Sequence, residues 1–169
     1  MPEETCRNTT GLCNYAHQDR EGERKQTCQL MSSIGVKATM VKVTAAVIEL
    51  DGKVLIAKRS KGRFAGKWEF PGGKVEPNET PEECLERELR EELGIETRVE
   101  RLICSSPYDY GGLMIELLAY RVCWLEGEIK PNEHEEIRWV SPGELNEYDF
   151  PEADIPIIGK LRDCSHTGR

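Results

Sequence analysis

The sequence predicts an α+β fold in which a mixed β-sheet is sandwiched between α-helices. Strand-like runs of apolar and β-branched residues recur along the chain, and two helical segments interrupt them. Because strands interleaved with helices bury both faces of their sheet, helices are expected on each side. A chain of 169 residues with 38% hydrophobic composition is sufficient for one such core, and no second core-forming segment follows it.

The first 35 residues differ in composition from the rest of the chain. Residues 1–35 are polar and lack a repeating apolar face, so we expect a disordered extension. The remaining residues, 36–169, are assigned to one domain. Its first two strand-like runs, MVKVTAAVIEL and KVLIAKR, are separated by Asp51-Gly52. This dipeptide predicts a hairpin, because a tight turn requires positive φ, which glycine tolerates best.

A helix is predicted from Glu79 to Gly94, with a signal at each end. Thr80 and Glu83 form a capping box, whose cap contributes roughly 1 kcal/mol, and Gly94 suits the C-terminal stop. Leucines recur every fourth residue and should pack this helix on the sheet. These leucines are Leu85, Leu89 and Leu93.

The second half of the chain predicts three more strands and a last helix. RVERLICSS, LMIELLAYRVCWL and EEIRWV have strand-like composition. Ser141 and Glu144 repeat the capping pattern before a short helical turn. The last helix is expected from Asp154 to Arg162, with Pro156 near its start.

Composition excludes several classes of protein. The net charge of −8 argues against a nucleic-acid polymer as partner, because duplex binding requires a basic surface. No apolar run is long enough for a membrane span, and the first thirty residues lack the apolar centre of a signal peptide. Seven cysteines, an odd number without a CxxC pair, indicate reduced thiols. A cytoplasmic protein is therefore expected.

Glu88, Glu91 and Glu92 are spaced so that they project from one side of the predicted helix. Two carboxylates 4 Å apart repel by about 4 kcal/mol at an effective dielectric near 20. Arg87 and Arg90 are expected to project elsewhere, so a hard divalent cation would relieve the repulsion. The alternative is a solvated acidic face without a ligand.

A longer pattern bears on this choice: Gly73-x5-Glu79-x7-Arg87-Glu88-Leu89-x-Glu91-Glu92-x-Gly94-Ile95. It resembles, position by position, the signature of the Nudix hydrolases. The resemblance implies a loop-helix-loop that binds divalent cations, Mg²⁺ or Mn²⁺, and cleaves a nucleoside diphosphate linked to another group. The flanking WEFPGGKVEP and DFPEADIPIIGKL resemble the MutT-like branch, whose members convert nucleoside triphosphates to monophosphate and pyrophosphate.

The resemblance also implies roles for individual residues. Arg87 resembles a structural arginine that pairs with Glu79. Glu88 is the first candidate for the general base and Glu79 the second. Glu133, six positions before Trp139, is implied as a further metal ligand, with Glu135 or Glu136 as alternatives, and His134 is expected to face solvent. The implied metal ligands are the Gly72 carbonyl and the carboxylates of Glu88, Glu91, Glu92 and Glu133.

The implied substrate contacts are less uniform. Arg59 and Lys74 are expected to contact the nucleotide, and Tyr110 lies where this branch places an aromatic near the base. Phe70 is either a substrate contact or a core residue. Asp154 either reads the base or caps the last helix. An ionised aspartate only accepts hydrogen bonds, which suits the amino group of cytosine. Leu113 stands where the 8-oxoguanine-specific enzyme has arginine, which weakens a guanine preference.

The resulting prediction is Mg²⁺-dependent hydrolysis of a cytosine nucleotide or an oxidised purine nucleotide such as 8-oxo-dGTP, which would cleanse the nucleotide pool. Alternatives are hydrolysis of a dinucleotide or ADP-ribose, and a non-catalytic nucleotide-binding module. The expected partner is a small-molecule nucleotide, with no nucleic-acid polymer and no membrane. The chain is expected to be a monomer or a homodimer.

Overall fold

The computed structural model describes residues 40–166. The predicted extension, residues 1–35, lies outside the described residues. Within them no helix is long and apolar enough to cross a membrane.

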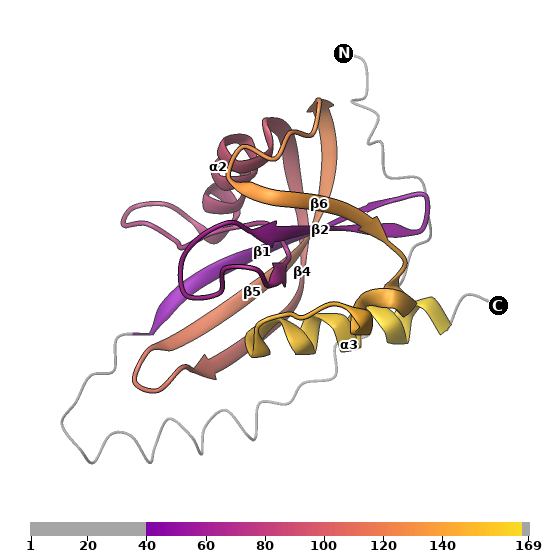
Figure 1. The fold of residues 1–169 in the computed structure, drawn as a ribbon. Helices are drawn as coiled ribbons and strands as arrows, with labels where there is room; N and C mark the ends of the chain where they lie inside the picture. Colours follow the sequence, from indigo (N-terminus) through magenta and orange to yellow (C-terminus); the bar gives the residue numbers. More distant parts are fainter. Residues whose placement is uncertain (1–39, 167–169) are drawn as a thin grey trace.

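The described strands form one mixed sheet (Figure 1). Its order is β3-β2-β1-β5-β4, with β6 paired to β2. β1 and β5 run parallel, whereas the other neighbouring pairs are antiparallel, so the predicted mixed sheet is confirmed. The strands are β1 (Val41–Leu50), β2 (Lys53–Arg59), β3 (Trp68–Glu69), β4 (Ile95–Asp109), β5 (Met114–Gly127) and β6 (His134–Val140).

Helices cover both faces of this sheet, as predicted. α2 (Pro81–Leu93) and α3 (Ile155–His166) lie on opposite sides (Figure 1). The alternation of side chains along β1 explains both contacts, because successive residues of a strand point to opposite faces. Ala46 and Ile48 pack in the cluster with α2, whereas Ala45 and Val47 pack in the cluster with α3.

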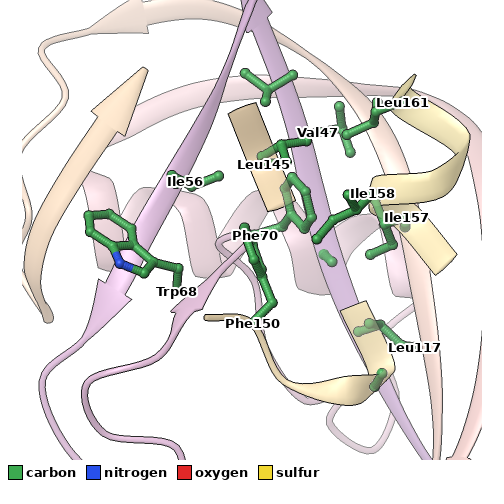
Figure 2. Packing of buried hydrophobic residues seen from close by; sticks show 14 of the residues in the cluster. Val47, Ile56, Trp68, Phe70, Leu117, Leu145, Phe150, Ile157, Ile158 and Leu161 are labelled. Atoms are coloured by element: carbon green, nitrogen blue, oxygen red, sulfur yellow. The ribbon is translucent and has the colours of Figure 1, made fainter. Parts of the chain in front are cut away.

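The core on the α3 side is rich in aromatic and branched side chains (Figure 2). Two 3₁₀ turns, η1 (Pro142–Glu147) and η2 (Glu152–Asp154), lead into α3 on this side. Phe70 stacks on Phe150 with ring centroids 5.4 Å apart, and both rings are buried. This arrangement fixes the segment that follows β3, which carries the glycine loop.

The local predictions for α2 are confirmed by its ends. The Glu83 amide donates to the Thr80 hydroxyl at 3.2 Å, and the Thr80 amide donates to the Glu83 carboxylate at 2.8 Å. The helix stops at Gly94, which has φ 70°. The three leucines of the stripe are fully buried against the sheet: Leu85, Leu89 and Leu93.

Two other expectations need correction. α3 begins at Ile155, because Asp154 belongs to the 3₁₀ turn η2 before it. Cys84 and Cys104 are free, as predicted, but Cys123 is disulfide-bonded, so reduced thiols throughout were wrongly predicted. Spacing along the chain does not report which cysteines the fold brings together.

Candidate active site

The glycine loop is bound to the edge of β1 by backbone hydrogen bonds. The Thr44 amide donates to the Gly73 carbonyl and the Ala46 amide to the Pro71 carbonyl, both at 2.7 Å. Gly72 has φ 151°, and a Cβ added there would lie 2.3 Å from the Thr44 carbonyl oxygen. The loop can therefore approach the strand this closely only with glycine at position 72.

The same loop lies directly against two carboxylates of α2. A Cβ added at Gly73 would lie 2.2 Å from the Glu88 carboxyl carbon, so loop and side chain are in contact. The Gly72 amide donates to the Glu92 carboxylate at 3.2 Å. The two glycines and the two glutamates thus form one compact unit, in which the α2 carboxylates face backbone rather than bulk water.

Arg87 connects three carboxylates of this site. Its guanidinium donates twice to Glu79, at 2.8 and 3.1 Å, which gives the expected ion pair. It also donates to Glu88 at 2.9 Å and to Glu91 at 3.3 Å. The expectation that Arg87 projects away from these carboxylates was wrong. Five donors on a long stem let one guanidinium reach both the loop and its own helix.

These contacts set the ionisation of the acidic side chains differently. Hydrogen bonds from Arg87, and then from the Glu76 amide, lower the pKa of Glu79 to about 2. Burial raises the pKa of Glu88 above its usual range despite Arg87. Burial also raises the pKa of Glu92 to about 7, with smaller contributions from Glu69 and Glu88. Glu79 is thus fixed as an anion, whereas Glu92 titrates near neutrality.

Glu69 organises the opposite wall of the site, and sequence reasoning did not identify it. Its carboxylate accepts from the Arg59 guanidinium and lies 3.1 Å from His134 Nε2. The sequence does offer one sign of it, because Glu69 stands between the aromatic residues Trp68 and Phe70 immediately before the glycine loop. In β3, burial of Trp68 and of the following Phe70 leaves Glu69 pointing to the other side, toward the site.

His134 is buried, so its expected exposure to solvent was wrongly predicted. It is the first residue of β6 and pairs with Arg59 of β2, and only 3% of its side chain is exposed. Burial alone would lower the pKa of His134, but the Glu69 hydrogen bond and the charge of Glu92 outweigh it, so the pKa is raised. The strand pairing of β2 with β6 is what brings this residue inward.

Between the two walls lies a small open hollow. Glu133 borders it from the residue before β6, and about half of its side chain is exposed. Within residues 40–166, no three acidic, histidine or cysteine side chains are gathered closely enough to hold a metal ion. Arg87 binds Glu88 and Glu91, and Glu92 is turned to Gly72. The lining residues are Arg59, Ser60, Lys61, Glu69, Glu92, Glu133 and His134.

The donor chemistry nevertheless fits a hard divalent cation. The predicted ligands all offer oxygen, which Mg²⁺ prefers. Glu92 is in addition a carboxylate removed from water, and burial without a matching cation is what raises its pKa. A cation beside Glu92 would remove that penalty.

The predicted substrate contacts occupy three different environments. Phe70 is buried in the core, so of the two alternatives, substrate contact or core residue, the structure shows the core residue. Lys74 is exposed and forms a bridge with Val43. Tyr110 is half-buried; its ring packs 5.0 Å from Phe64, and its hydroxyl accepts from the Ala153 amide.

Asp154 lies beside this aromatic group and is almost fully buried. Burial, and then the charge of Glu69, raise the pKa of Asp154 to about 8, although the Phe70 amide and Arg59 act in the opposite direction. The side chain is therefore largely protonated at neutral pH. A neutral carboxyl both donates and accepts hydrogen bonds, which differs from the ionised acceptor assumed from the sequence.

One prediction concerns the stability of the protein in chelator. The folded pKa of Glu92 lies above its unfolded value, so its contribution to stability is present at low pH and is lost as pH rises through about 7. Glu92→Gln should remove this loss. When pH is raised from about 4.5 to about 8, the free energy of unfolding of the variant should increase relative to that of the parent by on the order of 1–3 kcal/mol. Urea unfolding of both proteins at the two pH values measures the difference, and a constant difference would contradict it.

Comparisons with known proteins identify the family of the chain. The NUDIX domain family model matches residues 39–161. The chain is 45% identical over 120 residues to the CTP pyrophosphohydrolase of Escherichia coli K12, covering 70% of this chain and 89% of that protein. It is 38% identical over 113 residues to the 8-oxo-dGTP diphosphatase of the same organism, covering 66% and 88%.

A solved structure shows the same similarity. The chain resembles the solution structure of the E. coli ORF135 protein with a TM-score of 0.70 and 42% identity, over 76% of this chain and 93% of that one. The family match covers more than two thirds of the chain and includes the glycine loop, α2 and the opposite wall. The chain therefore belongs to the NUDIX family.

Proposed function

We propose that this protein hydrolyses a nucleoside triphosphate to its monophosphate and pyrophosphate, with Mg²⁺ as cofactor and Mn²⁺ as a possible substitute. The observation that carries the proposal is the contact of Glu88 and Glu92 with the Gly72-Gly73 loop, together with the hollow that Glu92 lines with Arg59 and Glu69. The names of the two E. coli relatives, a CTP pyrophosphohydrolase and an 8-oxo-dGTP diphosphatase, support a triphosphate substrate.

Members of this family generally need a divalent metal. In the proposal, the Gly72 carbonyl and the carboxylates of Glu88, Glu91, Glu92 and Glu133 hold it. A bound divalent cation would neutralise phosphate charge and make a nearby water more acidic. Arg87 donates to one oxygen each of Glu88 and Glu91, so the second oxygen of each carboxylate is left to bind the cation. Arg87 remains held by its paired hydrogen bonds to Glu79.

Glu88 is the proposed general base, and its surroundings favour it over Glu79. A base works best when its pKa lies near the working pH. Arg87 and the Glu76 amide hold the pKa of Glu79 at about 2, whereas burial raises the pKa of Glu88. Glu79 therefore retains the role of positioning Arg87, which in turn donates to Glu88 and orients its carboxylate.

The proposed binding site for the nucleobase of the substrate lies between Asp154 and Tyr110. Asp154 is buried beside Glu69 and Arg59, and Tyr110 presents a ring that can stack on a base. A neutral carboxyl can donate to a ring nitrogen and accept from an exocyclic amino group. Cytosine offers this pair of groups, and 8-oxoguanine offers N–H donors for the same carboxyl. Both substrates thus remain candidates.

Asp154→Leu should change the preference among bases. The leucine side chain is similar in size but neither donates nor accepts hydrogen bonds, whereas an amide would keep the donor and acceptor of the neutral carboxyl. We expect the ratio of kcat/KM values for cytosine and purine nucleotides to change by about tenfold or more. The concentration of Mg²⁺ needed for half-maximal rate should not change. An unchanged base ratio would remove Asp154 from the recognition residues.

A steady-state panel on the full chain tests the proposed function. Rates with CTP, dCTP, 5-methyl-dCTP, dGTP and 8-oxo-dGTP are measured with Mg²⁺, and products are separated by ion exchange. Monophosphate and pyrophosphate should appear, and Glu91→Gln should reduce their formation. Release of orthophosphate, or turnover only of dinucleotides or ADP-ribose, would contradict the proposal. Binding without turnover of any nucleotide would indicate a non-catalytic module.

The proposal includes a cellular setting. A small-molecule nucleotide is the proposed partner, the cytoplasm the proposed location, and cleansing of the nucleotide pool the proposed role. The protein would act as a monomer or a homodimer.

A further inference from the structure

We propose that Lys61 binds a phosphate group of the substrate, and that without substrate its ammonium group rests against Glu133. This inference rests on the proposed function, because it names a further residue of the same site. Lys61 lies in the segment between β2 and β3 and lines the hollow. Neither the sequence motif nor the predicted ligands include it.

The charge of the hollow shows why such a residue is needed. Its lining contains three carboxylates, Glu69, Glu92 and Glu133, but among the described residues only two permanent cations, Arg59 and Lys61. The permanent cations do not outnumber the carboxylates, so the hollow has no excess of fixed positive charge to offer a polyphosphate. A bound divalent cation supplies part of it, and a mobile side-chain cation supplies more.

Arg59 is less free than Lys61 to follow a phosphate, because it already has a partner. Its guanidinium donates through Nη1 to Glu69, whose side chain is only 12% exposed and which also contacts His134. The Arg59 side chain is 38% exposed, so the guanidinium can contact a substrate from this position. Moving it away would leave the partly buried Glu69 carboxylate without its cation, which is costly.

Lys61 is held far more weakly. Its ammonium group lies 3.9 Å from the Glu133 carboxylate, at the limit of an ion pair, and 79% of its side chain is exposed. Exposed pairs with this geometry contribute little to stability, so the ammonium group can leave at small cost. Neighbouring Lys58 differs, because it donates to Glu135 at 3.1 Å and its side chain is 27% exposed.

The backbone at Lys61 is nevertheless fixed beside the hollow. The Ser60 hydroxyl donates to the Glu133 carbonyl at 2.6 Å, which ties this segment to the start of β6. The flexible stem of Lys61 thus begins at a defined point of the rim. Its point charge can follow a phosphate without the strict geometry that a guanidinium requires.

Binding of inorganic tripolyphosphate to the full chain, measured by calorimetry at saturating Mg²⁺, tests this inference. Lys61→Met should weaken binding by roughly tenfold, because one charge-assisted contact to phosphate is lost. Lys61→Arg should restore most of the affinity. Lys58→Met is the matched control and should bind like the parent. Thermal melts of all three variants check that folding is unchanged.

Two outcomes would overturn the inference. Lys61→Met with parental affinity for tripolyphosphate would show that the residue does not contact phosphate. Weaker binding of Mg²⁺ alone, with phosphate affinity unchanged at saturating Mg²⁺, would show that Lys61 only positions Glu133. The proposed function fails separately: a parent protein that binds tripolyphosphate through Lys61 but cleaves no nucleoside triphosphate would contradict it and leave this inference standing.

Discussion

Replacing Glu88 by glutamine should lower kcat by about 10²–10⁴-fold, the usual contribution of a positioned general base. The amide cannot take a proton, although it keeps the size of the side chain that contacts Gly73. It can still accept a hydrogen bond from Arg87, so the site should keep its shape. Steady-state rates at saturating nucleotide and Mg²⁺ measure the loss, and urea unfolding checks the fold.

Two further variants make this result specific. Glu82→Gln removes a charge from the same helix at a position beside Tyr120 rather than beside the glycine loop, and should retain parental kcat. Glu79→Gln weakens the support of Arg87 and should lower kcat less than Glu88→Gln does. A larger loss for Glu79→Gln would show that the second candidate is the base, despite its low pKa.

The helix and the loop of this site could be predicted from sequence because their causes are local. Thr80 and Glu83 are three residues apart and cap one helix end. The leucine stripe follows from helical spacing alone. The predicted Arg87–Glu79 pair is also present, and both partners belong to the same motif. Short-range chemistry of this kind depends little on the rest of the fold.

Glu69 and His134 could not be placed by the same reasoning, because they meet across 65 positions of sequence. Their contact exists only once β2 pairs with β3 on one edge and with β6 on the other. The burial of Asp154 has the same origin, since η2 packs against the core beside Phe70. Long-range strand pairing and core packing thus decide which polar residues lose water, and hence their pKa values.

Gly72→Ala should destabilise the fold more than Gly73→Ala does. The new Cβ would lie 2.3 Å from the Thr44 carbonyl oxygen and 2.9 Å from the carbonyl carbon, both of them backbone atoms of a central strand. The φ of 151° adds conformational strain for any residue with a side chain. We expect a loss on the order of 2–5 kcal/mol from crowding and strain together. Urea unfolding measures this loss, and a loss below about 1 kcal/mol would contradict it.

The neighbouring glycine should respond differently, because the obstacle there can move. A Cβ at Gly73 would meet the end of the Glu88 side chain at 2.2 Å, and Gly73 has no positive φ. Gly73→Ala should therefore retain most of its stability but lose activity, since Glu88 must leave its position. Gly143→Ala, whose Cβ meets no atom within 4 Å, is the control and should keep both stability and rate. Opposite behaviour of the two loop variants would separate the glycine that lets the chain fold from the glycine that makes room for the catalytic carboxylate.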